Sequence, residues 1–261
     1  MKKRRAALIA AAVALIALSV AWMVGRHLGT PKGAGVPTAF ATAINLASAP
    51  ADVQAAAAIL KTSRVGYAMV KPDKTYLVIS TGATADTVSI DRAEGQPNLS
   101  DPSLVDIFLK TDAKGDSLMI ATTPLTKETE YQFDVDGRYA DIPTLHNRHN
   151  LPLIPLDAKT GFSLVRPAPG FQAEAGILEV EGYARVFEAQ FTAKLITEKG
   201  RVISQSAVMA AAGAPSWGSF STRLKFDEQN APETGYLVLE EEMTGAKLMV
   251  PVRFRKPAQM G

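Results

Sequence analysis

Cysteine is absent from the 261 residues of this chain. The absence excludes disulfide bonds, a thiolate nucleophile and a thiolate metal site, and it leaves the redox compartment open. With 47% apolar residues, the chain has the composition of a globular protein with a true hydrophobic core. The folded part must therefore be held together by packing alone.

Catalytic motifs are absent as well. The sequence has no Gly-x-Ser-x-Gly elbow, phosphate-binding loop or zincin motif. His146 and His149 have a spacing that suits a metal site on a helix, but Pro143 and Pro152 argue against a helix there. No acidic or thiol ligand is close by in the sequence, so we interpret the pair as solvated linker residues. We predict that the chain is not an enzyme and has no catalytic, cofactor-binding or metal-binding residues.

An excess of positive charge is absent outside the N-terminus. Lys2, Lys3, Arg4 and Arg5 supply four positive charges with no acid before residue 25, so the net charge of +2 becomes −2 for the rest of the chain. A slightly acidic body lacks the basic surface that binds phosphate backbones. We therefore expect no nucleic-acid partner, and no motif suggests a small-molecule substrate.

One apolar run, from Ala6 to Val24, is long enough to span a membrane as a helix. At about 1.5 Å per residue a helix there would span roughly 28 Å, close to the ~30 Å of a hydrocarbon core. The basic residues before the run outnumber those just after it, which predicts a single-pass anchor with a cytoplasmic N-terminus and all later domains outside the cell membrane. The alternative is a signal peptide cleaved after Ser19-Val20-Ala21, which would release a secreted protein.

The exported part divides into four segments by its composition and periodicity. Few charges and many small residues predict a flexible tether over 26–48. Strand patterns separated by turns predict a small antiparallel β domain over 49–145. Proline-rich sequence without a clean period indicates a linker over 146–160. The strand pattern then resumes over 161–256.

The small domain opens with the one short helix that we expect in it. Pro50 and Asp52 provide helix start signals, and four apolar side chains share one face of the run that ends near Thr62. These are Val53, Ala56, Ala57 and Leu60. A helix this short is not stable alone, so it should pack on the domain after it. Strands are expected at 65–70, 76–80, 87–91, 105–110, 117–122 and 131–135.

The second half reads as a β-sandwich. Alternating apolar residues predict strands at 162–165, 177–183, 187–197, 202–207, 219–226 and 236–240, and a last strand with Leu248, Val250, Val252 and Phe254 on one face. Seven strands within about a hundred residues are typical of an immunoglobulin-like fold. The predicted fold class is all-β: an N-terminal transmembrane helix, a small β domain and a seven-stranded immunoglobulin-like sandwich.

Two acidic clusters could be mistaken for functional sites. Asp134-Val135-Asp136-Gly137, followed by Asp141, has some features of a calcium loop, but an EF-hand's third alternating acid and terminal Glu are missing, which favours a strand end and turn. Glu240-Glu241-Glu242 could suggest catalytic carboxylates. A strand places Glu241 on the opposite side from its neighbours, and a solvated edge explains the cluster better.

Several segments of the second half resemble a known family. They are Phe162-Ser163-Leu164-Val165-Arg166-Pro167, Val180-Glu181-Gly182-Tyr183-Ala184, Phe187-Glu188-Ala189, Trp217 with Phe220, and Val250-Pro251-Val252. Together they are similar to the immunoglobulin-like domain of bacterial spore germination proteins. The resemblance implies an extracytoplasmic, membrane-attached setting and no catalytic residues.

A weaker resemblance concerns residues 50–145. Gly66-Tyr67-Ala68 and Thr75 to Gly82 look like the start of PrcB-like domains, named for a lipoprotein that stabilises a protease complex. Thr84-Ala85-Asp86-Thr87 stands where that family has a Thr-Gly-Gly-Tyr-like turn, so a binding role of that turn does not carry over.

These observations predict a non-enzymatic, membrane-anchored binding or scaffold protein of the cell envelope, linked to sporulation or germination. Its partner would be an envelope protein or a cell-wall component. The alternative is a regulator or stabiliser of an envelope protease. Trp217 and Tyr183 are the candidate partner contacts. The other interpretation of Trp217, which its place before a strand favours, is that it is buried and closes one end of the sandwich.

Overall fold

The computed structural model describes residues 41–82, 87–95, 104–113, 115–126, 129–173 and 176–254. The predicted membrane segment and most of the predicted tether lie outside these ranges. Among the described residues, no helix is both long and apolar enough to cross a membrane. The described chain is mostly β, with a single α-helix, and its strands form three sheets.

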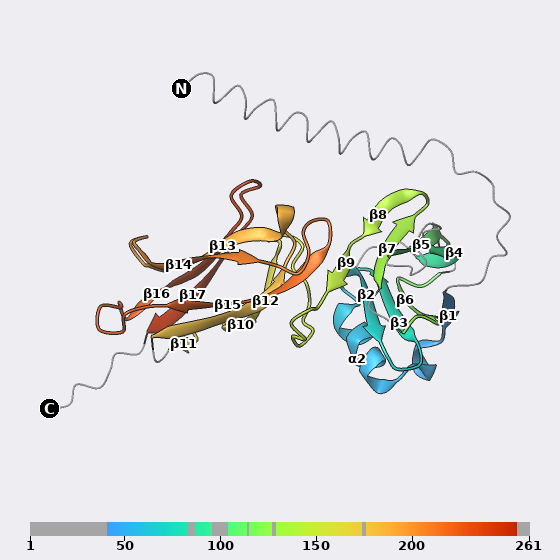
Figure 1. The fold of residues 1–261 in the computed structure, drawn as a ribbon, viewed down its shortest axis with the longest axis horizontal. Helices are drawn as coiled ribbons and strands as arrows, with labels where there is room; N and C mark the ends of the chain where they lie inside the picture. The colour runs from blue at the N-terminus through green and yellow to red at the C-terminus, as the bar shows by residue number, and fades with distance from the viewer. Residues whose placement is uncertain are drawn as a thin grey trace, which may run out of the picture. The chain divides into compact units, whose positions relative to one another are not determined.

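An eight-stranded sheet runs through both halves of the chain in the order β1-β6-β3-β2-β9-β15-β12-β10 (Figure 1). The small β domain supplies its first four strands, and the sandwich supplies its last three. The strands of this sheet are β1 (Thr42–Ile44), β2 (Arg64–Val70), β3 (Thr75–Thr81), β6 (Leu118–Thr123), β9 (Thr144–His146), β10 (Phe162–Arg166), β12 (Ile177–Ala184) and β15 (Trp217–Lys225).

Two smaller sheets cover this long sheet. One has the order β4-β5-β7-β8, and the other β11-β17-β16-β13-β14. The first comprises β4 (Val88–Gly95), β5 (Leu104–Thr111), β7 (Glu130–Val135) and β8 (Arg138–Ile142). The second comprises β11 (Gln172–Ala173), β13 (Gln190–Thr197), β14 (Val202–Met209), β16 (Thr234–Glu240) and β17 (Lys247–Phe254).

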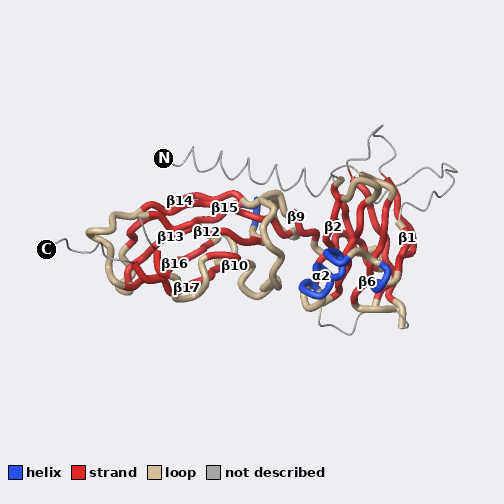
Figure 2. The backbone as a smooth tube through the Cα atoms, turned by 90° about the horizontal axis from the view of Figure 1, so that it is seen from below, coloured by secondary structure: helices blue, strands red, loops and turns tan. Residues whose placement is uncertain are grey.

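Strand β9 joins the two halves of the long sheet. It lies between β2 and β15 (Figure 2). Leu145 lies opposite Tyr67 of β2 on one side and opposite Trp217 of β15 on the other, and both pairings are parallel. The segment 144–156, which includes part of the expected linker, is therefore largely built into the fold. Leu151 is buried, and Leu153, Ile154 and Leu156 pack against the same core.

Helix α2 (Ala51–Leu60) buries the apolar face that the sequence predicts. Its buried residues are Val53, Ala56, Ala57 and Leu60. They pack with Val65, Tyr76 and Val78 of β2 and β3, so the expected packing of the helix on the following domain is confirmed. Asp52 of α2 also forms an ion pair with Lys71.

Three hydrophobic cores result from this arrangement. The sandwich core lies between β10, β12 and β15 and the five-stranded sheet, and it includes three aromatic rings in edge-to-face contact: Phe162, Phe191 and Phe220. A second core lies between β3 and the four-stranded sheet and includes Phe133. The third, here called the α2 core, lies under α2 and residues 151–156, and it includes Tyr183 and Trp217 from the sandwich strands.

One glycine is required by the packing of the second core. A Cβ atom on Gly66 would lie 2.1 Å from the nearest ring carbon of Phe133. The ring fills the space above β2 that any other residue would occupy.

The fold differs from the expectation in several respects. The small domain is not purely antiparallel, because β5 pairs with β7 in parallel. Residues Thr42–Ser48, expected in the tether, form β1 and the 3-10 helix η1 (Leu46–Ser48). The strand expected from Phe187 begins only at Gln190, because Glu188 and Ala189 have positive φ angles of 51° and 61° and form the 3-10 helix η2 (Phe187–Ala189).

Candidate functional site: a polar cleft beside β9

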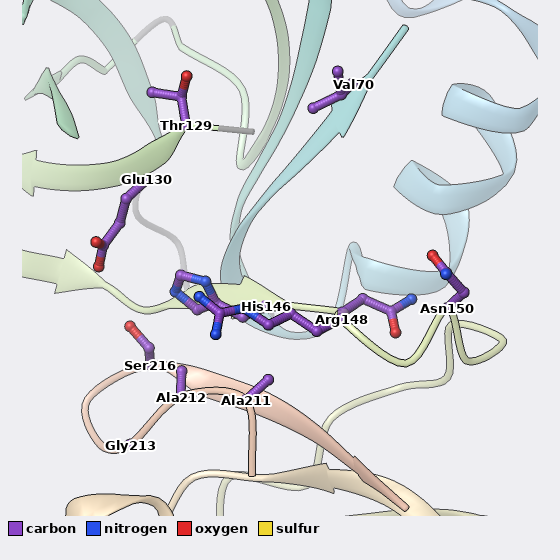
Figure 3. Close-up of a pocket in the computed structure, with 11 residues that line it drawn as sticks. Val70, Thr129, Glu130, His146, Arg148, Asn150, Ala211, Ala212, Gly213 and Ser216 are labelled. Atoms are coloured by element: carbon purple, nitrogen blue, oxygen red, sulfur yellow. The ribbon is translucent and has the colours of Figure 1, made fainter. Parts of the chain in front are cut away.

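An open cleft of about 1080 Å³ lies beside β9 (Figure 3). Its walls come from the end of β2, the start of β7, the turn after β9 and the loop before β15. They are Val70, Thr129, Glu130, His146, Asn147, Arg148, Asn150, Ala211, Ala212, Gly213 and Ser216. The cleft thus draws on both halves of the chain, at the point where β9 joins them.

The turn after β9 is held in place by hydrogen bonds from its own side chains. Asn147 donates from Nδ2 to the carbonyl oxygen of Leu151 at 2.8 Å, and its Oδ1 accepts from the Leu151 N–H at 2.9 Å. Ser219 of β15 anchors the middle of the turn, since its Oγ accepts from the His149 N–H at 3.1 Å and lies 2.9 Å from the His149 ring Nδ1. These hydrogen bonds therefore hold the backbone of the turn that carries Arg148 in a fixed position beside the cleft.

The opposite wall, residues 211–216, is equally constrained. The Ala211 N–H donates to the Ser219 carbonyl at 2.9 Å, and the Ala214 N–H donates to the Val186 carbonyl at 2.8 Å. The loop crosses so close to Gly218 that a Cβ atom there would lie 2.2 Å from the Ala212 nitrogen. Only glycine at this position lets the loop fold over the start of β15.

The cleft is lined mainly by groups that form hydrogen bonds. The side chains of His146 and Arg148 lie in the middle of Figure 3, and Glu130, Ser216 and Asn150 are also drawn. A guanidinium group in such a recess can bind a carboxylate or phosphate through two parallel hydrogen bonds. Amide and hydroxyl groups beside it suit a polar ligand such as an extended peptide or a glycan.

A smaller recess of about 330 Å³ continues the cleft along β2. It shares Asn147, Arg148 and Asn150 with the main cleft and adds Tyr67, Met69 and Lys71. Tyr67 is half-buried, and burial raises the pKa of its hydroxyl above the ordinary value. This extension gives the cleft an apolar and aromatic wall at the end of β2.

The two residues predicted as candidate contacts lie below the surface, outside the cleft. Trp217 is 1% exposed and Tyr183 is 0% exposed. The Tyr183 hydroxyl donates to the Leu151 carbonyl at 3.1 Å, and burial raises the pKa of this hydroxyl strongly. A partner could reach either side chain only if the α2 core opened.

The burial favoured for Trp217 is confirmed, but its location differs from the expectation. It packs in the α2 core rather than in the sandwich core, because Trp217 points to the side of β15 opposite Phe220. The Arg185 guanidinium lies 5.4 Å from the centre of the indole ring. The indole therefore holds the sandwich to α2 and residues 151–156.

The two histidines are not held together as a pair. His146 is the last residue of β9 and lines the cleft, whereas His149 is tied to Ser219 in the turn. Among the residues that the structure describes, no group of three or more metal-ligating side chains comes together. Residues 147–150 form a turn and not a helix, in agreement with the interpretation from Pro143 and Pro152.

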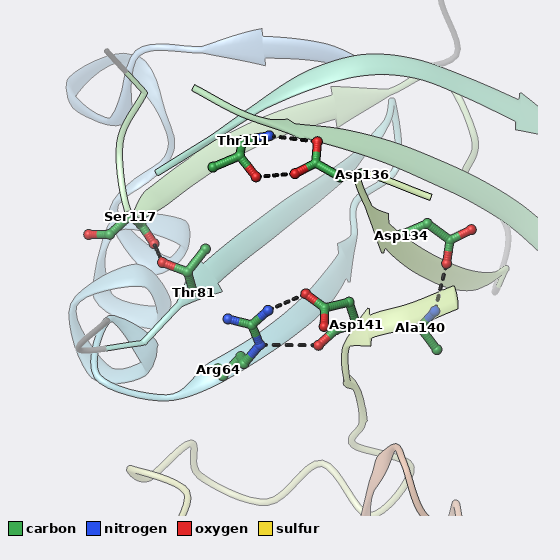
Figure 4. A network of polar contacts seen from close by, with 8 residues as sticks. All are labelled: Arg64, Thr81, Thr111, Ser117, Asp134, Asp136, Ala140 and Asp141. Carbon is green, nitrogen blue, oxygen red and sulfur yellow. Dashed lines mark hydrogen bonds and ion pairs between the residues drawn. The ribbon is translucent and has the colours of Figure 1, made fainter. Parts of the chain in front are cut away.

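The aspartates that could suggest a calcium loop are each engaged separately (Figure 4). Asp134 Oδ1 accepts from the Ala140 N–H at 2.6 Å, and Asp136 Oδ1 accepts from the Thr111 N–H at 3.1 Å. Asp141 pairs with Arg64. The interpretation of this segment as a strand end and turn is confirmed, with Asp136 and Gly137 at the β7–β8 turn.

The acidic cluster Glu240 to Glu242 divides among three environments. Glu240 pairs with Lys194 and Lys247, and Glu242 is exposed. Glu241 is buried and accepts hydrogen bonds from the Met243 N–H at 2.7 Å and from Thr244. Burial opposes ionisation of Glu241, but the hydrogen bonds from Thr244 and Met243 outweigh it and lower the pKa of this carboxyl.

Most of the cleft residues were not singled out from the sequence. Of the residues in the segment predicted as a linker, only His146 stands out in the sequence, as half of a histidine pair, whereas Arg148 and Asn150 do not. One usable signal is the concentration of histidine and asparagine between Pro143 and Pro152, since polar residues in an ordered loop are typical of binding sites.

The fold and the cleft define an immunoglobulin-like β-sandwich joined through a shared sheet to a smaller β domain. The family model of the immunoglobulin-like domain of bacterial spore germination matches residues 163–245, which confirms the resemblance expected for the second half. A comparison with curated proteins found no match.

Proposed function

We propose that this chain is a non-enzymatic binding or scaffold protein of the bacterial cell envelope, acting in sporulation or germination. The observation that carries the proposal is the match of residues 163–245 to the immunoglobulin-like domain of bacterial spore germination. Sandwiches of this class present loops and edges from a rigid frame, and their chemistry is recognition.

The cleft beside β9 is the surface that we assign to the partner. Its walls are fixed by the bonds from Asn147 and Ser219, so little ordering entropy is lost on binding. Arg148 and Asn150 are exposed at its rim and can form hydrogen bonds with a polar partner. A segment of an envelope protein or the peptidoglycan of the cell wall has carboxylate and amide groups that can form these hydrogen bonds.

The proposal also places the small β domain and the sandwich outside the cell membrane. The basic flank Lys2–Arg5 and the apolar run 6–24 support an N-terminal anchor with the sandwich outside. Membrane fractionation with an alkaline wash tests it: the anchored chain stays with the membranes. A soluble product that begins near Trp22 would show that the segment is a cleaved signal peptide.

Binding to envelope fractions tests the cleft. Full-length chain in detergent is incubated with purified cell walls and, separately, with solubilised envelope proteins. The variant Arg148→Ala combined with Asn150→Ala should lose about tenfold or more in affinity, as expected for central polar contacts. Lys159→Ala, at an exposed turn residue away from the cleft, should bind as the wild type does.

A second function is favoured by the resemblance of residues 50–145 to PrcB-like domains. In that case the bound partner is an envelope protease, and its activity or lifetime changes when the chain is present. The same binding experiment separates the two functions, because co-purification of a protease favours the regulator, whereas cell-wall material or a structural germination protein favours the scaffold.

A further inference from the structure

A second recess lies on the sandwich, on the outer face of the five-stranded sheet, and it has a different character from the cleft. It has a volume of about 450 Å³ and is formed by η2, β13, β14 and the turn after β16. Three large apolar side chains at its rim are exposed to solvent: Phe187 (48%), Met209 (66%) and Met243 (78%). We call it the Met-Phe groove.

The apolar side chains of the groove are presented by a fixed backbone. Phe187 precedes Glu188 and Ala189, whose positive φ angles turn the chain outward before β13 begins. The Ala210 N–H donates to the Ala189 carbonyl at 2.8 Å, which ties this turn to the end of β14. The exposure of Phe187 is thus built into the fold and is not a frayed loop.

Met243 is held in a similar way. It belongs to the turn between β16 and β17, and the buried carboxylate of Glu241 organises that turn by accepting from the Met243 N–H at 2.7 Å. Met209 is the last residue of β14, paired with Gln190 of β13. Three separate elements therefore converge to expose apolar side chains around one recess. Exposed apolar groups gathered in this way indicate a surface that a partner covers.

Methionine suits such a surface. Its unbranched, polarisable side chain adapts to the shape of an apolar partner, and methionines are frequent at protein surfaces that bind peptide segments. The recess can hold one or two apolar side chains of a partner, given that pockets for small ligands begin at about 300 Å³.

The charges around the groove are acidic. Glu188 and Glu242 are exposed at its rim, and neither takes part in an ion pair among those found in the described residues. Glu240 is neutralised by Lys194 at 2.8 Å and Lys247 at 3.4 Å. No residue that lines the groove is basic. The rim therefore repels acidic peptides and anionic lipid headgroups and attracts lysine and arginine.

We propose that the Met-Phe groove is a docking site for a protein segment in which apolar side chains are flanked by lysine or arginine. The apolar side chains insert between Phe187, Met209 and Met243, and the basic side chains pair with Glu188 and Glu242. The groove shares no lining residue with the cleft beside β9, so the proposal goes beyond the function proposed above and does not depend on the cleft's partner.

Three synthetic peptides test the proposal by titration against the full chain in detergent. One has an apolar centre and basic flanks (KRLFLKR), one has the same centre with acidic flanks (EDLFLED), and one has basic flanks with a polar centre (KRSGSKR). We expect measurable binding of the first, at least tenfold weaker binding of the other two, and a decrease in affinity with added salt.

Variants place the binding on the groove. Met209→Ser and Phe187→Ser should each weaken KRLFLKR about tenfold, whereas Val202→Ser, at the other end of the same strand β14 and also exposed, should not. Glu188→Lys with Glu242→Lys should weaken KRLFLKR and strengthen EDLFLED, and Glu233→Lys, at an exposed position away from the groove, should do neither.

Other outcomes would overturn the proposal. Equal binding of KRLFLKR and EDLFLED, or equal effects of Met209→Ser and Val202→Ser, would mean that the groove does not select its ligand by charge or position. Absence of peptide binding together with concentration-dependent dimers that Met209→Ser abolishes would show that a second copy of the chain covers the groove. Binding to phosphatidylglycerol vesicles that Phe187→Ser abolishes would show a membrane contact instead.

Discussion

Truncation of Trp217 should destabilise both the small β domain and the sandwich. The indole is 1% exposed and packs in the α2 core with Leu145, Leu151 and Tyr183. A packed indole buries about 150–250 Å², and removing it from a core costs roughly 3–5 kcal/mol. Because the cavity would lie between the sandwich strands and α2, we expect Trp217→Ala to loosen the contact between the two halves.

Urea denaturation followed by circular dichroism measures this effect, since the variant lacks the Trp217 indole whose fluorescence would report on the α2 core. A loss of several kcal/mol is a large share of the stability of a protein this size. Trp217→Phe should lose less, because the ring still fills part of the space. The exposed Val202→Ala is the matched control and should change the stability by less than about 0.5 kcal/mol.

Two results would refute this reasoning. An unchanged unfolding midpoint for Trp217→Ala would mean that the indole is not packed as described. Unfolding of the variant in two steps, with the sandwich keeping its wild-type midpoint, would show that the α2 core does not couple the halves. In that case the sandwich would fold as a domain of its own.

Three further predictions concern single contacts. Gly218→Ala should destabilise the chain by at least about 2 kcal/mol in thermal melts, because the new Cβ would lie 2.2 Å from the Ala212 nitrogen. For comparison, the Cβ added by Gly137→Ala would meet nothing within 4 Å, so that variant measures only the backbone cost of replacing a glycine with a positive φ angle. Tyr183→Phe should cost roughly 1 kcal/mol by removing the bond to the Leu151 carbonyl, and no loss would mean that water replaces it. Glu241→Gln should lower the stability at neutral pH by about 1–2 kcal/mol, because the hydrogen bonds from Met243 and Thr244 are stronger to a carboxylate. The folded-state pKa of Glu241 is lowered, so this contribution is present above the pKa of the unfolded chain and is lost as the pH falls through the folded-state pKa. The unfolding free energies of the wild type and of Glu241→Gln should therefore converge in acid. A difference that does not change with pH would contradict the role given to the Glu241 carboxylate.

Local patterns predicted the elements that depend on local physics. The buried face of α2 follows from the spacing of Val53, Ala56, Ala57 and Leu60, and the sandwich strands follow from alternation that continues for six residues or more. The pattern misleads at Phe187, which continues the alternation of β13 in sequence but is turned outward by the backbone of Glu188 and Ala189. Hydrophobicity alone does not encode that turn.

The junction between the halves could not be predicted, because it depends on contacts between distant segments. Strand β9 has three residues, too few for a period to be recognised, and it is specified by pairing with β2 and β15. The burial of Trp217 was predictable from its size and position. Its choice of the α2 core over the sandwich core was not, because that choice depends on where residues 151–156 pass. The cleft could not be predicted for the same reason, because its walls come from both halves of the chain.

Site-directed photo-crosslinking in intact cells tests the central claim most directly. A photoreactive residue is placed at Ser216 in the cleft and, as the control, at Glu198 in the exposed turn after β13, which is absent from the cleft lining. The account predicts a discrete envelope adduct from position 216 that disappears with Arg148→Ala and Asn150→Ala, and none from position 198. Adducts of equal yield from both positions, or an adduct from position 216 that the cleft substitutions leave unchanged, would contradict it.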